Sequence, residues 1–140
     1  MYVRSAIATP LVVLILAACG AGSGGGVDQS PPQGLVPTFA SIQANVFTPT
    51  CAKVLCHGGA AAQQGLRLDA GFSYGNLINV ASPQDPNQTR VIPGDPDNSL
   101  IVHKLEGTQT VGARMPDNGP YLQQSTIDVI RVWIANGAQQ

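Results

Sequence analysis

Apolar residues recur every three to four positions near the start of the chain's central part, and this period predicts a short amphipathic helix. Its apolar positions are Phe39, Ile42, Val46 and Phe47. We expect the helix to begin at Pro37 or Thr38 and to end near Pro49. A second helical segment of one or two turns is expected within residues 74–80.

Two further helices are predicted downstream by their capping residues and apolar spacing. The first is capped by Asn98 or Ser99, runs to about Leu105 and ends at Gly107. The second is capped by Ser125 and stopped near its end by a glycine. Its apolar stripe is formed by Ile127, Ile130 and Ile134, with Trp133 at the edge.

The segments between these helices are rich in glycine and proline. Residues 82–97 contain four prolines and are predicted to be loop, as are residues 108–120. No stretch makes a convincing strand. The predicted fold class is therefore mostly α, a small domain of three to five short helices joined by long loops.

Composition allows one domain with a small core. The chain has 140 residues, of which 5% are aromatic, with 16 glycines and 11 prolines. A large buried cofactor could supply apolar volume that the side chains lack. Without Arg4 of the N-terminal segment, six basic face eight acidic residues, and no basic run occurs. Nucleic acid is therefore not an expected partner.

Residues 1–18 have the layout of a secretory signal: Arg4, an apolar run, then small residues. The final Leu16-Ala17-Ala18-Cys19 resembles the bacterial lipobox. That resemblance implies cleavage before Cys19 and attachment of a diacylglycerol to its sulfur. An ordinary signal peptide cleaved after Ala18 is the alternative. The predicted domains are thus a signal peptide at 1–18, a flexible tether at 19–37 and a folded domain at 38–140. Gly20 resembles the sorting residue of lipoproteins anchored in the outer membrane, facing the periplasm.

The sharpest chemical signal is Cys51-Ala-Lys-Val-Leu-Cys56-His57. Covalent attachment of a c-type haem needs two thiols for its vinyl groups and an imidazole directly after the second thiol. The usual spacing between the thiols is two residues, whereas here it is four. On a regular helix, positions five apart point about 140° away from each other. Both sulfurs can reach one haem edge only if residues 52–55 bulge outward.

Met115 is the candidate for the second axial ligand. Electron-transfer cytochromes commonly bind haem iron with one His and one Met. Met115 lies 58 residues after His57, in a polar loop that precedes the last predicted helix, and Pro116 follows it. His103, on the preceding helix, is the alternative distal ligand.

Several stretches together resemble the cytochrome c-like domains of exported bacterial proteins. They are Cys56-His57-Gly58, residues 90–99, residues 104–107, Arg114-Met115-Pro116 and residues 127–134. The resemblance implies a fold whose first and last helices cross, and one covalent haem c held by thioether bonds to Cys51 and Cys56. It implies His57 as the proximal ligand and Met115 as the distal ligand of the iron. It further implies an electron carrier rather than an enzyme, with a redox protein as partner and the membrane reached through the lipid anchor.

Two other interpretations of the cysteines stay open. Cys51 and Cys56 could form a disulfide in a haem-free interaction module, closing a short loop. Alternatively, two thiolates, an imidazole and a thioether would suit a copper ion. No arrangement of residues typical of hydrolytic catalysis is present.

Overall fold

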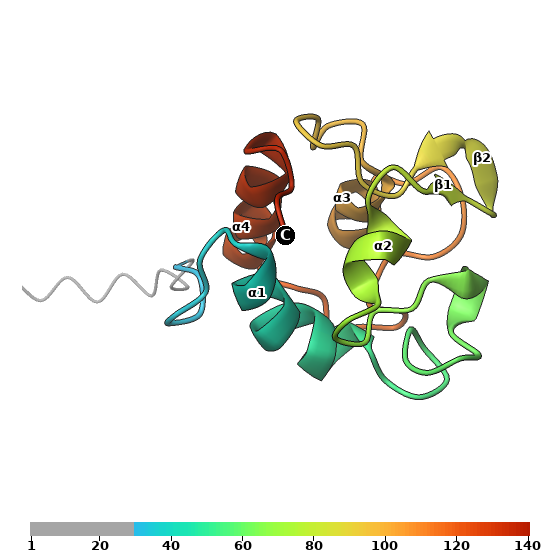
Figure 1. Ribbon diagram of the computed structural model, residues 1–140, viewed down its shortest axis with the longest axis horizontal. Coiled ribbons are helices and arrows are strands. Elements are labelled where there is room, and N and C mark those ends of the chain that lie inside the picture. Colours follow the sequence, from blue (N-terminus) through green and yellow to red (C-terminus); the bar gives the residue numbers. More distant parts are fainter. Residues whose placement is uncertain (1–29) are drawn as a thin grey trace, which may run out of the picture.

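The computed structural model describes residues 30–140, so the predicted signal peptide, the Cys19 lipid attachment and most of the predicted tether lie outside the described residues. Within that range the chain forms four α-helices, a π-helical segment, a 3₁₀ turn and one two-stranded sheet (Figure 1). The bounds in chain order are α1 Phe39–Ile42, the π-helical segment Gln43–Cys51, the 3₁₀ turn Gln63–Gly65, α2 Ser73–Leu77, β1 Ala81–Ser82, β2 Asp85–Thr89, α3 Leu100–Glu106 and α4 Gln124–Ala135.

Helical residues make up 36% of the described residues, a share that does not by itself place the fold in the mostly α class. The number of helices agrees with the prediction for the described residues, but the sheet was not predicted. β1 and β2 pair antiparallel within the segment expected to be loop, with Ala81 opposite Thr89 and Ser82 opposite Asp85. Pro86 lies in β2. A two-stranded ladder leaves one edge of each strand free, and proline is tolerated on such an edge.

The first helix begins as predicted and continues further than predicted. The Thr38 side chain accepts a hydrogen bond from the backbone N–H of Ser41, which caps α1. The chain then widens into the π-helical segment, and the Ala52 N–H reaches the Phe47 carbonyl five residues back at 2.8 Å. The helix therefore passes through Pro49, where the sequence predicted its end, and finishes at Cys51.

One apolar core joins the ends of the described chain. Phe39 of α1 contacts Trp133 of α4, with ring centroids 5.8 Å apart, and Figure 1 shows these two helices side by side. Trp133 is buried, and its indole N–H donates to the Gln139 carbonyl. The core also takes in residues from the other helices and from the connecting loops, among them Val46, Phe47, Leu68, Leu77, Val91, Val102, Leu105, Ile127, Ile130 and Ile134.

Core packing begins slightly before the predicted domain start at residue 38. Leu35 is buried in the core cluster, and its N–H donates to the Pro32 carbonyl. Because Leu35 falls within the segment predicted as tether, at least the last residues of that segment are packed against the domain.

The bounds of α3 agree with its sequence signals, whereas the start of α4 does not. Ser99 holds the N-cap position of α3, but its hydroxyl donates to the Asp95 carbonyl and makes no capping hydrogen bond. Gly107 ends the helix with a left-handed φ of +82°. The N-cap of α4 is Gln123, so Ser125 lies inside the first turn. The predicted Ser125 cap is therefore wrong, and the Ser125 hydroxyl is buried without a hydrogen-bond partner among the described residues.

No helix formed by residues 30–140 combines the length and apolar character needed to cross a bilayer.

Candidate functional site

The segment between Cys51 and His57 folds back on itself in a tight bulge. The Lys53 carbonyl accepts from the N–H groups of both Cys56 and Gly58, each at 3.0 Å, and Leu55 adopts a positive φ of 71°. Val54 and Leu55 are consequently 83% and 84% exposed. The outward bulge that the four-residue spacing requires is thus the conformation of this segment.

This bulge brings the second cysteine and the histidine back to the end of the helix. The His57 N–H donates to the Cys51 carbonyl at 3.2 Å. Burial, together with a smaller effect of the charge of Cys56, raises the pKa of the Cys51 thiol to about 11. Cys56 is exposed, and both are free thiols in the structure. The two sulfurs therefore belong to one local site with one partly buried and one accessible thiol.

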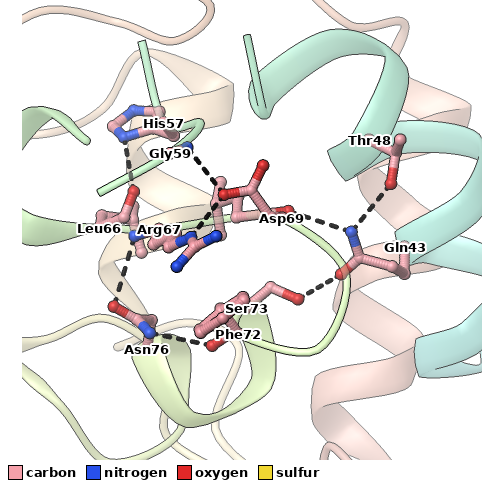
Figure 2. A network of polar contacts seen from close by, with 11 residues as sticks. Gln43, Thr48, His57, Gly59, Leu66, Arg67, Asp69, Phe72, Ser73 and Asn76 are labelled. Atoms are coloured by element: carbon pink, nitrogen blue, oxygen red, sulfur yellow. Dashed lines mark hydrogen bonds and ion pairs between the residues drawn. The ribbon is translucent and has the colours of Figure 1, made fainter. Parts of the chain in front are cut away.

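The His57 imidazole is held by one of its two nitrogens. Its Nδ1 lies 3.2 Å from the Leu66 carbonyl oxygen, which can only accept, so Nδ1 carries the proton of this hydrogen bond (Figure 2). Burial lowers the pKa of the imidazole, and the positive charges of Arg90 and Lys104 lower it further. The backbone carbonyls of Leu66 and Gln63 raise the pKa but do not cancel this decrease. The neutral ring then carries its lone pair on Nε2, the nitrogen that a metal would need.

A polar network fixes the loop that carries the Leu66 carbonyl. The Asp69 carboxylate accepts from the Gly59 N–H at 2.8 Å and from Arg67 Nε at 2.6 Å, and these bonds lower the pKa of that carboxyl (Figure 2). The His57 carbonyl accepts from the Leu68 N–H at 2.7 Å. The loop is thus closed on both sides of His57.

Gln43 ties the same loop to the π-helical segment. Its buried side chain donates to the Leu68 carbonyl at 3.0 Å and to the Thr48 hydroxyl, and it accepts from the Ser73 hydroxyl of α2 (Figure 2). Three elements around the Cys51–His57 segment are therefore joined through one buried amide. Its apolar neighbours Val46 and Phe47 were identified from the sequence, but Gln43 was not.

Gly58 has a steric role that its position directly after His57 did not reveal. A Cβ at this residue would lie 2.6 Å from the Ala52 carbonyl oxygen and 2.9 Å from the Ala52 carbonyl carbon. Both are backbone atoms of the bulge, so only glycine fits there without a backbone shift.

Arg90 fastens the far side of the His57 loop. It is 8% exposed, and its guanidinium donates to the Asn76 carbonyl at 2.8 Å and to the Gln64 carbonyl at 2.7 Å. Gln64 lies in the 3₁₀ turn immediately before Leu66. In the sequence, Arg90 was noted only as the first residue of the stretch 90–99, one of those on which the resemblance to cytochrome c-like domains rests. The structure gives it the task of holding α2 and the turn before Leu66 together.

Met115 lies in a loop that is bound to α3. Its N–H donates to the Lys104 carbonyl at 2.8 Å, and its side chain packs, partly buried, against the same core cluster as Cys51. Arg114 donates from Nε to the Leu105 carbonyl at 3.1 Å and stacks over the Tyr121 ring. The hydrogen bonds of the described residues tie Met115 to α3, and none of them joins it to Cys51, Cys56 or His57.

His103, the alternative distal ligand, lies in a different surface hollow. Its Nδ1 is 2.9 Å from the Thr108 hydroxyl, and the hollow is lined by residues of β2, of the segment before α3 and of the loop after α3, including Gln88, Asn98 and Thr110. Cys51, Cys56, His57 and Met115 do not line this hollow.

A direct metal site is a second possibility for these donors. Within residues 30–140, no three Cys, His, Asp or Glu side chains gather closely enough to bind a metal ion. A copper ion held directly by Cys51, Cys56 and His57 would need such a group. A haem needs only two axial ligands from the protein to bind its iron.

Searches with this chain against protein-family models, curated proteins and solved structures found no match.

Proposed function

We propose that this chain is a lipid-anchored monohaem c-type cytochrome that carries single electrons outside the cytoplasm. The observation that carries the proposal is the bulge of residues 52–55, which folds the chain back so that the His57 N–H donates to the Cys51 carbonyl despite the long spacing. The orientation of the His57 ring supports it, because Nδ1 is engaged by the Leu66 carbonyl and Nε2 is left for the iron.

In this proposal each residue of the donor set has one task. The Cys51 and Cys56 thiols would attach the haem by adding to its two vinyl groups, each S–H becoming an S–C and a C–H bond with nothing released. His57, through Nε2, and the Met115 thioether would hold the iron. The bound haem supplies one-electron chemistry at its iron. The protein contributes attachment, ligands and an apolar surrounding.

The same assignment favours an electron carrier over an enzyme. With His57 and Met115 both bound, the iron has no open position for a substrate. The partner of such a carrier is another redox protein, and the lipid on Cys19 would keep the domain at the membrane. Residues 20–30 are mostly glycine and small polar residues, a composition typical of a flexible tether between anchor and domain.

The proposal is tested by expressing the full chain in a bacterial host with a haem-maturation system and staining a denaturing gel for haem. The wild-type band should stain, because thioether bonds survive denaturation. Cys51→Ser and Cys56→Ser should each weaken the stain, and the double variant should abolish it. A colourless wild-type protein that lacks free thiols would instead support the Cys51–Cys56 disulfide. A colourless protein with free thiols that binds copper would support the copper site.

A further inference from the structure

Lys104 is a buried lysine on α3 with an unusual set of partners. It is only 8% exposed. Its ammonium contacts the Gln84 side-chain oxygen at 3.1 Å, the Val111 carbonyl, and the Ala113 carbonyl at 3.4 Å. Gln84 belongs to the turn between β1 and β2, and the two carbonyls belong to the loop that leads to Met115.

These partners are all uncharged. The ion pairs among residues 30–140 join Arg67 to Asp69 and Arg131 to Asp97 and Glu106, and none includes Lys104. Removing an ammonium from water is costly, and neutral acceptors compensate that cost less well than a carboxylate does. A buried lysine in such surroundings is poorly explained by stability alone. Its geometry points to a positioning task.

The loop after α3 is fastened to the helix by this residue and its neighbour. The Lys104 carbonyl accepts from the Met115 N–H at 2.8 Å, while its ammonium binds the loop two and four residues earlier. The Leu105 carbonyl accepts from Arg114 Nε at 3.1 Å. Lys104 and Leu105 of α3 therefore bind residues 111–115 through both a side chain and backbone carbonyls.

Gly112 shows how closely the loop approaches the ammonium. A Cβ at Gly112 would lie 2.6 Å from Lys104 Nζ and 2.9 Å from the Gln84 side-chain nitrogen. A side chain at residue 112 would therefore have to displace the Lys104 ammonium and the Gln84 amide.

We infer that Lys104 is a positioning residue: its ammonium fastens residues 111–115 to α3 and thereby sets the place of the Met115 thioether. The loop-fastening part stands on contacts within the chain. The consequence for iron ligation rests on the proposed function.

The first measurement concerns the loop itself and needs no haem. Amide hydrogen exchange is followed in the full chain for wild type, Lys104→Met and Lys104→Arg. Lys104→Met keeps a long unbranched side chain but removes the charge-assisted hydrogen bonds. It should speed exchange at the Met115 amide about tenfold or more. Lys104→Arg keeps a cation with several donors and should restore most of the protection. Amides of α4 should change in neither variant. Unchanged exchange at Met115 in Lys104→Met would overturn the inference.

A pair of glycine variants keeps the test decisive if Lys104→Met fails to fold. Gly112→Ala would push a methyl group against the ammonium. Gly71→Ala is the matched control, because Gly71 also has a positive φ but has open space where its Cβ would be. Exchange at Met115 should rise in Gly112→Ala and stay near wild type in Gly71→Ala. Equal effects of the two variants would contradict the inference.

The second measurement separates this inference from the proposed function. In haem-loaded wild type, the weak far-red absorption band of Met–iron coordination should be present. Lys104→Met should lose most of that band while keeping its covalent haem, and Lys104→Arg should retain it. Fast loop exchange in Lys104→Met with no haem in any variant would sink the proposed function but leave the loop-fastening role. A full Met–iron band in Lys104→Met would overturn the positioning of Met115.

Discussion

Gly58→Ala tests whether the bulge after Cys51 is as tightly packed as the structure shows it. The added Cβ would lie 2.6 Å from the Ala52 oxygen, 2.9 Å from the Ala52 carbonyl carbon and 3.0 Å from the Lys53 carbonyl carbon. All three are backbone atoms, and the Lys53 carbonyl is already held by the N–H groups of Cys56 and Gly58. The clash therefore cannot be relieved by rotating a side chain. Forced backbone shifts of this kind cost about 1–3 kcal/mol of stability.

Gly75→Ala is the matched control for this substitution. Gly75 lies in α2 with no atom within 4 Å of where its Cβ would be. Replacing a glycine by alanine in a helix should raise stability by about 0.5–1 kcal/mol. The same substitution should thus act in opposite directions at the two sites.

The assay is urea unfolding of the purified full chain. The urea concentration at the unfolding midpoint is compared between variants that share the same slope m. With a slope of about 1–3 kcal/mol per molar urea, Gly58→Ala should lower the midpoint by roughly 1 M. Gly75→Ala should leave the midpoint unchanged or raise it. If Gly58→Ala unfolds at the wild-type midpoint, the described conformation of the bulge is wrong. If both variants are destabilised equally, the effect is not due to the Ala52 contact.

Three further predictions concern single buried groups. Since the pKa of Cys51 is raised to about 11, its thiolate is scarce at neutral pH. Alkylation of Cys51 in haem-free protein should therefore speed up about tenfold per pH unit from pH 8 to 10, and a plateau below pH 9 would contradict the burial of this thiol. Ser125→Ala removes a buried hydroxyl without a partner among the described residues, so it should raise the melting temperature by a few degrees or leave it unchanged; a clear drop would show that the hydroxyl has a partner. Arg90→Gln loses the bonds to Asn76 and Gln64 and should cost about 2–3 kcal/mol in urea unfolding, whereas a wild-type midpoint would mean that Arg90 does not fasten this loop.

The parts of the fold that the sequence predicted well depend on local signals. α3 begins after Ser99 and ends at Gly107 because a helix end is decided by a few neighbouring residues. The outward bulge was expected only on the condition that Cys51 and Cys56 attach to one haem edge, since positions five apart do not share one side of a regular helix.

The parts that were missed depend on contacts between distant segments or on exceptions to local rules. Because residues 82–97 contain four prolines, they were predicted to be loop. The β1–β2 pairing forms there nonetheless, because a strand with a free edge tolerates proline. The π-helical turn that carries the chain past Pro49 leaves no signal in the apolar period. Ser125 resembles a cap but sits one residue inside the first turn, after Gln124.

The positioning residues were harder to find than the ligand candidates. Lys104 follows Leu100 by one helical turn, so its place on the inward face could have been noticed from the period. Its partners Val111 and Ala113 could not, since they lie in a loop without regular structure. Arg90 likewise acts on carbonyls of Asn76 and Gln64, and backbone acceptors leave no trace in the sequence.

The central claim is that Cys51 and Cys56 hold one haem covalently. The intact mass of the full chain, expressed with haem maturation and measured under denaturing conditions, tests it most directly. The account predicts a mass greater by one haem than that of the Cys51→Ser/Cys56→Ser double variant expressed in the same way, apart from the two substitutions, and that the extra mass stays with the peptide containing both cysteines after proteolysis. A mass with no haem added, with Cys51 and Cys56 free or joined to each other, would contradict it.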